Sequence, residues 1–262
     1  MAIIITLLLV GVAVGFINTL AGGATILTLS ALMFLGLPVT VANGTHRIAA
    51  IFQTSTSVAA FRRGGALDLR TGLALAAPTV AGSIAGSLIA VRVPEETFAR
   101  IAGVMMLFVL YLVLFRPHHW LRERLAPHAG HGGLRLLRHL VFFGIGVYGG
   151  FIHIGVGYLL LAGLLATEDM DLVRANAVKV LLVLIYLPFS LAVFVKGGLV
   201  HYSYGLVLAV GQAAGAYAGA HTAVRRGAGF VRWFVVAMIL ILVPHLFGWY
   251  DLNGLVRGLM PR

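Results

Sequence analysis

The chain has 262 residues, of which 60% are hydrophobic and only 10% are charged, whereas a soluble domain carries about a quarter charged residues; the composition therefore indicates an integral membrane protein. The absence of Cys excludes disulfides, thiolate metal ligands and cysteine nucleophiles. The net charge of +11 does not indicate a nucleic-acid-binding protein, because most arginines fall in short stretches between apolar segments, where they orient a chain in the membrane.

In chain order, ten apolar segments are predicted in two sets of five. The first set covers 3–20, 24–36, 42–61, 69–91 and 97–115, and the second covers 139–153, 155–166, 175–195, 203–223 and 231–248. A helical span needs about 20 apolar residues, so the length allows about eight to ten crossings. The predicted organisation is a first transmembrane repeat at 1–115, a polar linker at 116–138 and a second repeat at 139–250.

The first two segments are predicted to form a hairpin. As one helix, residues 3–36 would measure about 50 Å at 1.5 Å per residue, which exceeds the hydrocarbon thickness of a bilayer. Gly22 and Gly23 in "LAGGAT" interrupt the run, and glycine disfavours continued helix. We therefore expect one helix, a turn at the glycines and a short helix back, and the same in the second half at "FIHIGVGY", where Gly155 aligns with Gly22.

The two halves are related by a shift of 133 residues. Over 42–92, eighteen of fifty-one positions are identical to 175–225 without a gap; Asn43, for example, falls on Asn176. Shared membrane composition would give roughly a tenth, so the pattern indicates an internal duplication.

Five segments per half would make the repeats inverted. The stretches 62–70, 116–138, 166–174 and 224–232 would then share one side with twelve Lys and Arg, against five on the other side. Four segments per half would divide them eleven against six, so the positive-inside rule favours inversion. We predict an all-α polytopic protein of two inverted repeats in a prokaryotic inner membrane, with both termini outside.

The paired breaks point to a substrate site. Inverted-repeat transporters bind substrates near the midplane, and matching glycine-broken helices are the usual indication of the place. Helix N-termini at such breaks suit an anion, so Gly22, Gly23 and Gly155 are predicted to line a central cavity. The alternative is that these glycines only permit close helix packing, which is the role predicted for Gly82, Gly86, Gly215 and Gly219.

Two cations stand inside predicted segments. Arg47 ends "ANGTHR", and His46 beside it aligns with Lys179, so each half contributes a cation shortly after its shared Asn. An arginine fork suits an oxyanion, and all eight acidic residues fall outside the predicted segments. We predict a cationic anion site lined by Asn43, Thr45, His46, Arg47, Asn176 and Lys179. The alternative is that Arg47 and Lys179 extend to lipid headgroups.

Six other polar residues are further candidates for substrate binding: Asn18, Thr19, Thr25, Gln53, His153 and Gln212. The alternative for each is a hydrogen bond between helices, which is the commoner fate of lone polar groups in bundles. Histidine as a residue type titrates near neutral pH, so His46 and His153 are candidates to carry a coupled proton. The partners considered are a small anion, membrane lipid and a coupled proton or cation.

No cofactor or catalytic group is predicted. The linker contains His118, His119, His128 and His131, with His139 just after it, but their spacing matches no common metal-ligand pattern and Glu123 is the only acid among them. We interpret it as a solvated loop. The sequence contains no G-x-S-x-G, H-E-x-x-H or Walker motif, which argues against an enzyme.

Several motifs resemble the sulfite exporter TauE/SafE family of permeases for sulfur-containing anions: "GFINTLAGGAT" (15–25), "GLPVTVANGTHR" (36–47), "FRRGGALD" (61–68), "RANAVK" (174–179) and "GQAAGAYAGA" (211–220). Ala24, Ser30 and His46 stand where the family usually has Gly, Pro and Asn. The resemblance implies secondary transport, without an ATP site, of sulfite, sulfonates, thiosulfate or related anions. An anion-selective or small-solute channel is the alternative.

Overall fold

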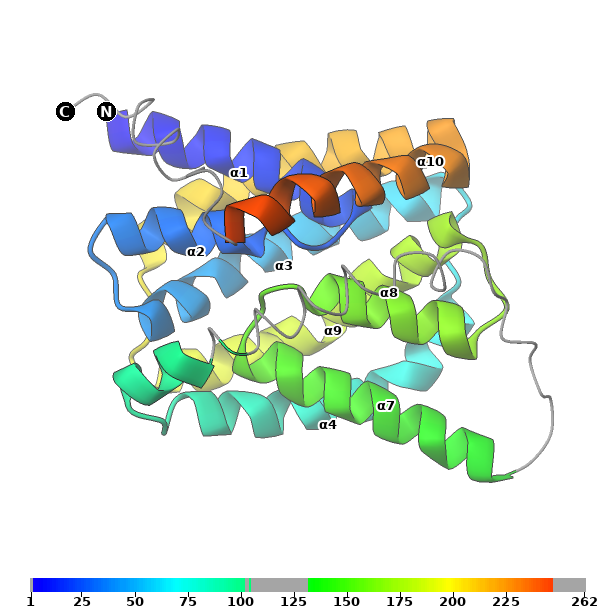
Figure 1. Ribbon diagram of the computed structural model, residues 1–262, viewed down its shortest axis with the longest axis horizontal. Coiled ribbons are helices and arrows are strands. Elements are labelled where there is room, and N and C mark those ends of the chain that lie inside the picture. The colour runs from blue at the N-terminus through cyan, green and yellow to red at the C-terminus, as the bar shows by residue number, and fades with distance from the viewer. Residues whose placement is uncertain (1, 102–103, 105–131, 247–262) are drawn as a thin grey trace.

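The computed structural model describes residues 2–101, 104 and 132–246 (Figure 1). All regular structure in this part of the chain is α-helical, as predicted. Most of the predicted segment 97–115, the linker as far as residue 131 with four of its histidines, and the last two residues of the segment 231–248 lie outside the described residues. The first helix after the linker begins at Gly132, inside the range assigned to the linker.

The helices follow the predicted segments closely. The first half contains α1 (Ala2–Leu20), α2 (Thr25–Phe34), α3 (Val39–Arg63), α4 (Leu69–Ala90) and a helical stretch at 95–101. The second half contains α7 (Gly132–Phe151), α8 (Val156–Thr167), α9 (Leu172–Lys196) and α10 (Tyr202–Leu246). Gly227 interrupts α10 with non-helical angles (φ 71°, ψ −174°), between the two segments predicted there.

Both predicted hairpins are present. α1 ends at Leu20, Gly22 adopts a φ of 92°, and α2 then runs back alongside α1 (Figure 1). Gly155, with a φ of 71°, occupies the same place between α7 and α8. Positive φ is strained for residues with a Cβ, so the glycines explain why the helices stop here.

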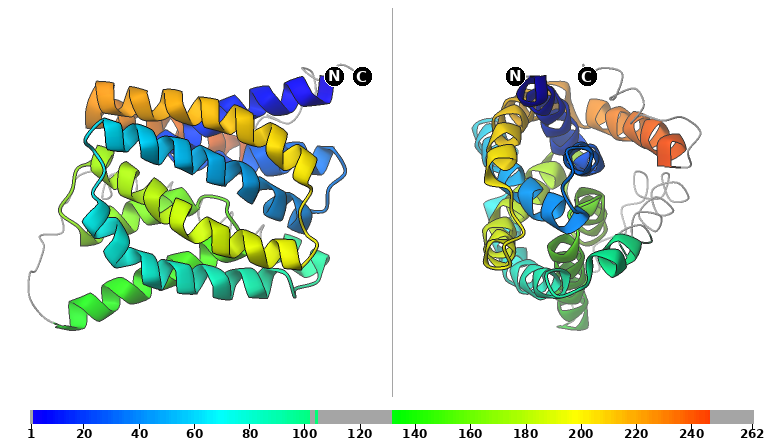
Figure 2. Two further views of the ribbon diagram at one scale, coloured as in Figure 1. Left: turned by 180° about the vertical axis from the view of Figure 1, so that it is seen from behind. Right: turned by 90° about the vertical axis from the view of Figure 1, so that its left-hand side faces the viewer.

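The fourth helix of each half packs against the first helix of the other half. α4 packs against α7 of the second half, and α10 packs against α1 of the first, while α3 and α9 lie side by side between these pairs (Figure 2). A Cβ at Gly82 would fall on the carbonyl oxygen of Phe143, and one at Gly215 on that of Val12. The predicted packing role of these glycines is confirmed, since only a missing side chain allows such backbone approach.

The connections gather at two ends of the bundle. The α3–α4 and α8–α9 connections, the start of α7 and the bend within α10 lie at one end, and the N-terminal end of α1 lies towards the other (Figure 1). By length and hydropathy, three described stretches are suited to crossing a bilayer: Ile3–Leu20, Leu69–Ala90 and Leu172–Lys196. The polar residues of α3 are mostly buried within the protein.

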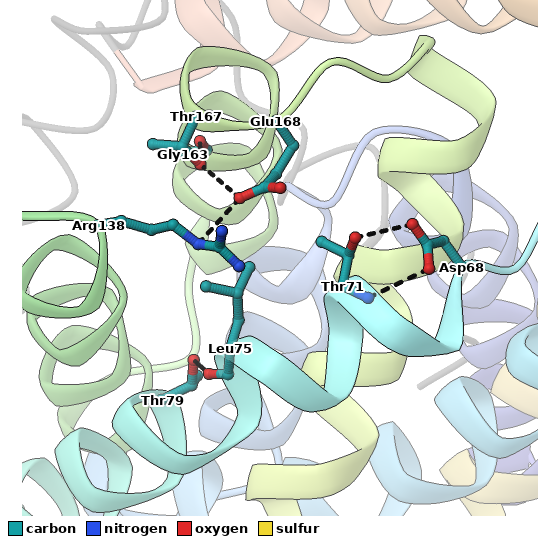
Figure 3. Close-up of polar contacts among 8 residues, drawn as sticks. All are labelled: Asp68, Thr71, Leu75, Thr79, Arg138, Gly163, Thr167 and Glu168. Atoms are coloured by element: carbon teal, nitrogen blue, oxygen red, sulfur yellow. Dashed lines mark hydrogen bonds and ion pairs between the residues drawn. The ribbon is translucent and has the colours of Figure 1, made fainter. Parts of the chain in front are cut away.

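Polar contacts fasten the end where α3 meets α4 (Figure 3). The Asp68 carboxylate caps α4 by accepting bonds from the Thr71 N–H (3.1 Å) and hydroxyl (2.7 Å). Nearby, the Arg138 Nε lies 3.0 Å from a carboxylate oxygen of Glu168, which ties α7 to the end of α8. Burial raises the pKa of Glu168, and the Arg138 guanidinium opposes that rise.

We expect Asp68→Ala to lower the free energy of unfolding by about 1 kcal/mol at pH 7, which is typical for loss of an N-cap. The bonds from Thr71 hold the pKa of Asp68 below its usual value. The carboxylate therefore stabilises the fold above the unfolded-state pKa of about 3.9, and this contribution is lost as pH falls through the lower folded-state pKa. Thermal unfolding of the detergent-solubilised protein should show a deficit at pH 7 that shrinks below about pH 4. A pH-independent deficit, or an equal one in the exposed control Asp169→Ala, would contradict the capping role.

Candidate functional site

The two helix breaks meet inside the protein. A Cβ at Gly22 would lie 2.8 Å from the Cα of Gly157, and one at Gly157 would lie 2.7 Å from the Cα of Gly22. A Cβ at Gly23 would collide with the ring of Tyr158. The turn before α2 therefore packs against the first turn of α8, so the N-terminal ends of these two helices come together. The same glycines therefore allow both the break in each helix and the close packing of the two breaks.

Asn43 and Asn176 each form a hydrogen bond to the helix break of the opposite half. The Asn43 amide donates to the carbonyl of Phe151, the last residue of α7, at 2.9 Å. The Asn176 amide donates to the carbonyl of Leu20, the last residue of α1, also at 2.9 Å. The Asn shared by the two repeats thus makes the same hydrogen bond in each case, to the last carbonyl of the broken helix in the other repeat.

Arg47 is fully buried at the C-terminal end of α7. One Nη donates to the Gly149 carbonyl (3.2 Å) and the Ser190 hydroxyl (2.6 Å), and the other donates to the Gly150 carbonyl (2.6 Å). The guanidinium carbon also lies 4.4 Å from the centre of the Phe194 ring. The last carbonyls of a helix lack partners within it and carry negative partial charge. Arg47 satisfies them here.

Lys179 does the same for α1. Its Nζ donates to the carbonyls of Asn18 (3.3 Å) and Thr19 (3.4 Å) and to the Asn176 side chain (2.6 Å). Only 2% of Lys179 is exposed, and Arg47 is not exposed at all. The alternative that these two cations extend to lipid headgroups is therefore wrong. Each instead stabilises the broken helix of the opposite half, and whether they also face one another stays a prediction.

His46 lies in the interior without a hydrogen-bond partner on either ring nitrogen among the described residues. Its ring centre is 5.3 Å from that of His153. His153 is held on two sides, since its Nδ1 is 3.0 Å from the Tyr186 hydroxyl and its backbone N–H donates to the side-chain Oδ1 of Asn43 at 3.3 Å. Two candidate histidines are therefore brought together at the second break.

The first break is surrounded by neutral polar groups. The Asn18 side-chain Nδ2 donates to the Thr25 hydroxyl (3.3 Å) and to the side-chain Oε1 of Gln53 (3.5 Å), and the Asn18 Oδ1 accepts from the Ala24 N–H (2.7 Å). These contacts bring three predicted site residues together: Asn18, Thr25 and Gln53.

Three other predicted residues hold helices together. The Thr19 hydroxyl bonds the Ser57 hydroxyl (2.8 Å), the Thr45 hydroxyl accepts from the His201 N–H (2.9 Å), and the Gln212 amide donates to the Thr28 hydroxyl (3.2 Å). For Thr19 and Gln212 these bonds fit the alternative of a hydrogen bond between helices. The Gln212 carbonyl oxygen is left without a partner in the described part of the chain.

The buried charges at this site are all positive. Among the described residues, Arg47 and Lys179 are the buried Lys and Arg side chains, and no Asp or Glu is buried with them. Within the same residues, no group of three or more His, Cys, Asp or Glu is placed to hold a metal ion. Carbonyl and hydroxyl dipoles offset the two charges only in part, and the N-terminal ends of α2 and α8 add further positive potential. Such an arrangement attracts an anion.

Comparison with known proteins decides the family. The family described as "Sulfite exporter TauE/SafE" matches residues 7–246. The chain belongs to the TauE/SafE family. It is 25% identical to a probable membrane transporter protein of Sinorhizobium over 88% of this chain and 87% of that protein. It is 25% identical to one of Haemophilus influenzae (92% and 94%) and 26% identical to YfcA of Escherichia coli (95% and 90%), each also named a probable membrane transporter protein. No solved structure matches.

Membership of the TauE/SafE family makes the chain a membrane transporter for a small-molecule substrate. Its apolar helices agree with an integral membrane protein. The resemblance inferred from the sequence motifs is confirmed over nearly the whole chain.

Sequence reasoning missed several polar residues of this TauE/SafE site. The Tyr186 hydroxyl holds His153, the Ser190 hydroxyl binds Arg47, and the buried Tyr158 hydroxyl beside Gly23 has no partner among the described residues. The shift of 133 residues would have found two of them, because Gln53 falls on Tyr186 and Ser57 on Ser190.

Proposed function

We propose that the chain is a secondary transporter of small sulfur-containing anions such as sulfite, sulfonates or thiosulfate, and that the anion binds where the two helix breaks meet. The observation that carries this proposal is the contact between Gly22 and Gly157, which joins the N-terminal ends of α2 and α8 beside buried cations. In the described interior no carboxylate cancels those cations.

The role proposed for each residue depends on whether its hydrogen-bond donors are still free to bind an anion. The Nζ of Lys179 already binds carbonyls, so Lys179 acts on the anion through its charge. Both Nη atoms of Arg47 also bind carbonyls, but its buried Nε has no partner among the described residues and can still donate. The N–H groups of Leu27 and Tyr158 bond the carbonyls of Ala24 and Gly155. The earlier N–H groups of the two helices, those of Thr25, Ile26, Val156 and Gly157, are therefore proposed to form the cradle with Gly22, Gly23 and Gly155. The Tyr158 hydroxyl, on the ring beside Gly23, is also buried without a partner among the described residues and is proposed to complete the cradle.

Transport is proposed to use inverted repeats, 1–115 and 139–250, in an inner membrane. In Figures 1 and 2, α1 and α7 run in opposite directions, as do α3 and α9, which supports this arrangement. The connection 62–70, which contains three Arg residues, lies at the same end of the bundle as the connection 166–174, and we assign this end to the cytoplasm, with the N-terminus outside. Rocking of one repeat against the other would expose the site to each side in turn.

The proposal is tested with purified protein in two assays. Sulfite, thiosulfate, methanesulfonate and acetate are compared for their effect on the melting temperature, because a ligand that binds only the native state raises it. The same anions are then followed into proteoliposomes. We expect a shift and saturable uptake for at least one sulfur anion. Uptake that does not saturate would indicate a channel, and no shift and no uptake for all three sulfur anions would overturn the proposal.

A further inference from the structure

His46 lies in the proposed anion site with its hydrogen-bonding capacity unused. Both ring nitrogens are buried and have no partner among the described residues. Leaving a buried polar group unpaired costs about 1–3 kcal/mol, so such a group in a native protein needs an explanation. The ring of His153 packs against it, with 5.3 Å between the ring centres.

Among the described residues, no buried Asp or Glu lies with this histidine pair. Arg47 follows His46 on α3, and the Tyr186 hydroxyl on α9 lies 3.0 Å from the His153 Nδ1. The Tyr148 hydroxyl on α7 donates to the carbonyl of Ile154, next to His153, and the His201 N–H, just before α10, donates to the hydroxyl of Thr45, next to His46. α1 and α2 carry no titratable side chain within their bounds. A proton on either imidazole would place a second positive charge near Arg47.

That second charge becomes favourable when an anion is present. Like charges near one another in a buried site repel strongly, and an anion between them replaces the repulsion with two attractions. Proton binding at the histidines and anion binding at the helix breaks therefore favour one another. This coupling must be reciprocal, so the anion binds more tightly when the proton is available.

We propose that His46 and His153 bind one proton together with the anion, so that the protein is an anion–proton symporter. The inference rests on the proposed function. A proton from water on one side binds a ring nitrogen of the pair when the anion is seated. After the site opens to the other side, the anion leaves and the proton returns to water there. A monovalent anion then crosses with no net charge.

The test uses proteoliposomes that contain a pH-sensitive dye, with methanesulfonate as the probe, because this anion carries no proton at neutral pH. For the wild type we expect internal acidification with about one proton per anion. Uptake should not respond to a membrane potential set by potassium and valinomycin. In His46→Asn and His153→Asn the proton-to-anion ratio should fall about tenfold, and accumulation should change about tenfold per 60 mV, because the anion now carries its charge across alone. The exposed control His221→Asn should match the wild type.

The outcomes separate the two proposals. If wild-type uptake is driven by the membrane potential and causes no acidification, the symport proposal is wrong but the proposed transport of sulfur anions stands. The same conclusion follows if acidification persists in both histidine variants. Thiosulfate and sulfite are assayed in parallel, and absence of uptake for all three anions overturns both proposals. If neither variant yields folded protein by size-exclusion chromatography, the wild-type responses to pH and potential decide.

Discussion

We expect Gly22→Ala to abolish anion uptake and to lower the free energy of unfolding by about 2–5 kcal/mol, the sum of backbone strain and overpacking. Gly22 has a φ of 92°, where a residue with a Cβ is strained. The added carbon would also lie 2.8 Å from the Cα of Gly157, and backbone cannot move aside as a flexible side chain can. The substitution therefore pushes apart the two breaks that form the proposed anion site.

The matched control is Gly36→Ala. Gly36 has a similar φ of 86°, but a Cβ there would meet nothing within 4 Å. This variant should show only the strain, about 1–2 kcal/mol, and keep its uptake. Thermal unfolding in detergent and uptake in proteoliposomes measure both effects. Equal losses in the two variants would mean that the contact between the breaks is unimportant.

The second large effect is expected for Lys179→Met, which keeps the length of the side chain and removes its charge. We expect anion affinity to fall by roughly tenfold or more, since about 1.4 kcal/mol of lost attraction gives a factor of ten. The free energy of unfolding should change by less than the free energy of anion binding. The carbonyls of Asn18 and Thr19 lose a donor, but the cost of burying an ammonium group also disappears.

This difference separates an electrostatic role for Lys179 from a purely structural one. The control Lys196→Met removes an exposed lysine from the end of α9 and should behave as wild type. A Lys179→Met protein with a much lower melting temperature but normal uptake per folded molecule would show that Lys179 only supports α1. Anion-induced melting shifts and uptake rates are the two measurements.

The helical hairpins and buried cations could be predicted because each leaves a local signal. Gly22, Gly23 and Gly155 interrupt apolar runs, and Arg47 and Lys179 stand out within them. The internal duplication could also be predicted from the sequence. The partners of these residues could not, because backbone carbonyls have no sequence pattern: nothing indicates that Arg47 binds Gly149 and Gly150, or that each repeat fastens the broken helix of the other.

Lone polar residues were the least predictable part of the site. Thr45 and Gln212 were predicted to bind substrate, yet each makes a bond to another helix or its preceding turn. Sequence cannot separate these uses, because the same hydroxyl or amide serves either and the neighbour that decides is distant along the chain. Tyr186 and Ser190 were overlooked because they look like ordinary helix residues until the repeats are aligned.

The most direct measurement of the central claim is the position of a bound anion. Selenite has the shape and charge of sulfite, and its selenium can be located by anomalous diffraction from crystals soaked or grown with it. We predict a peak between the start of α2 and the first turn of α8, near Gly23 and Tyr158. A peak found only among the exposed arginines of the loops, such as Arg62 and Arg63, would contradict the proposed site.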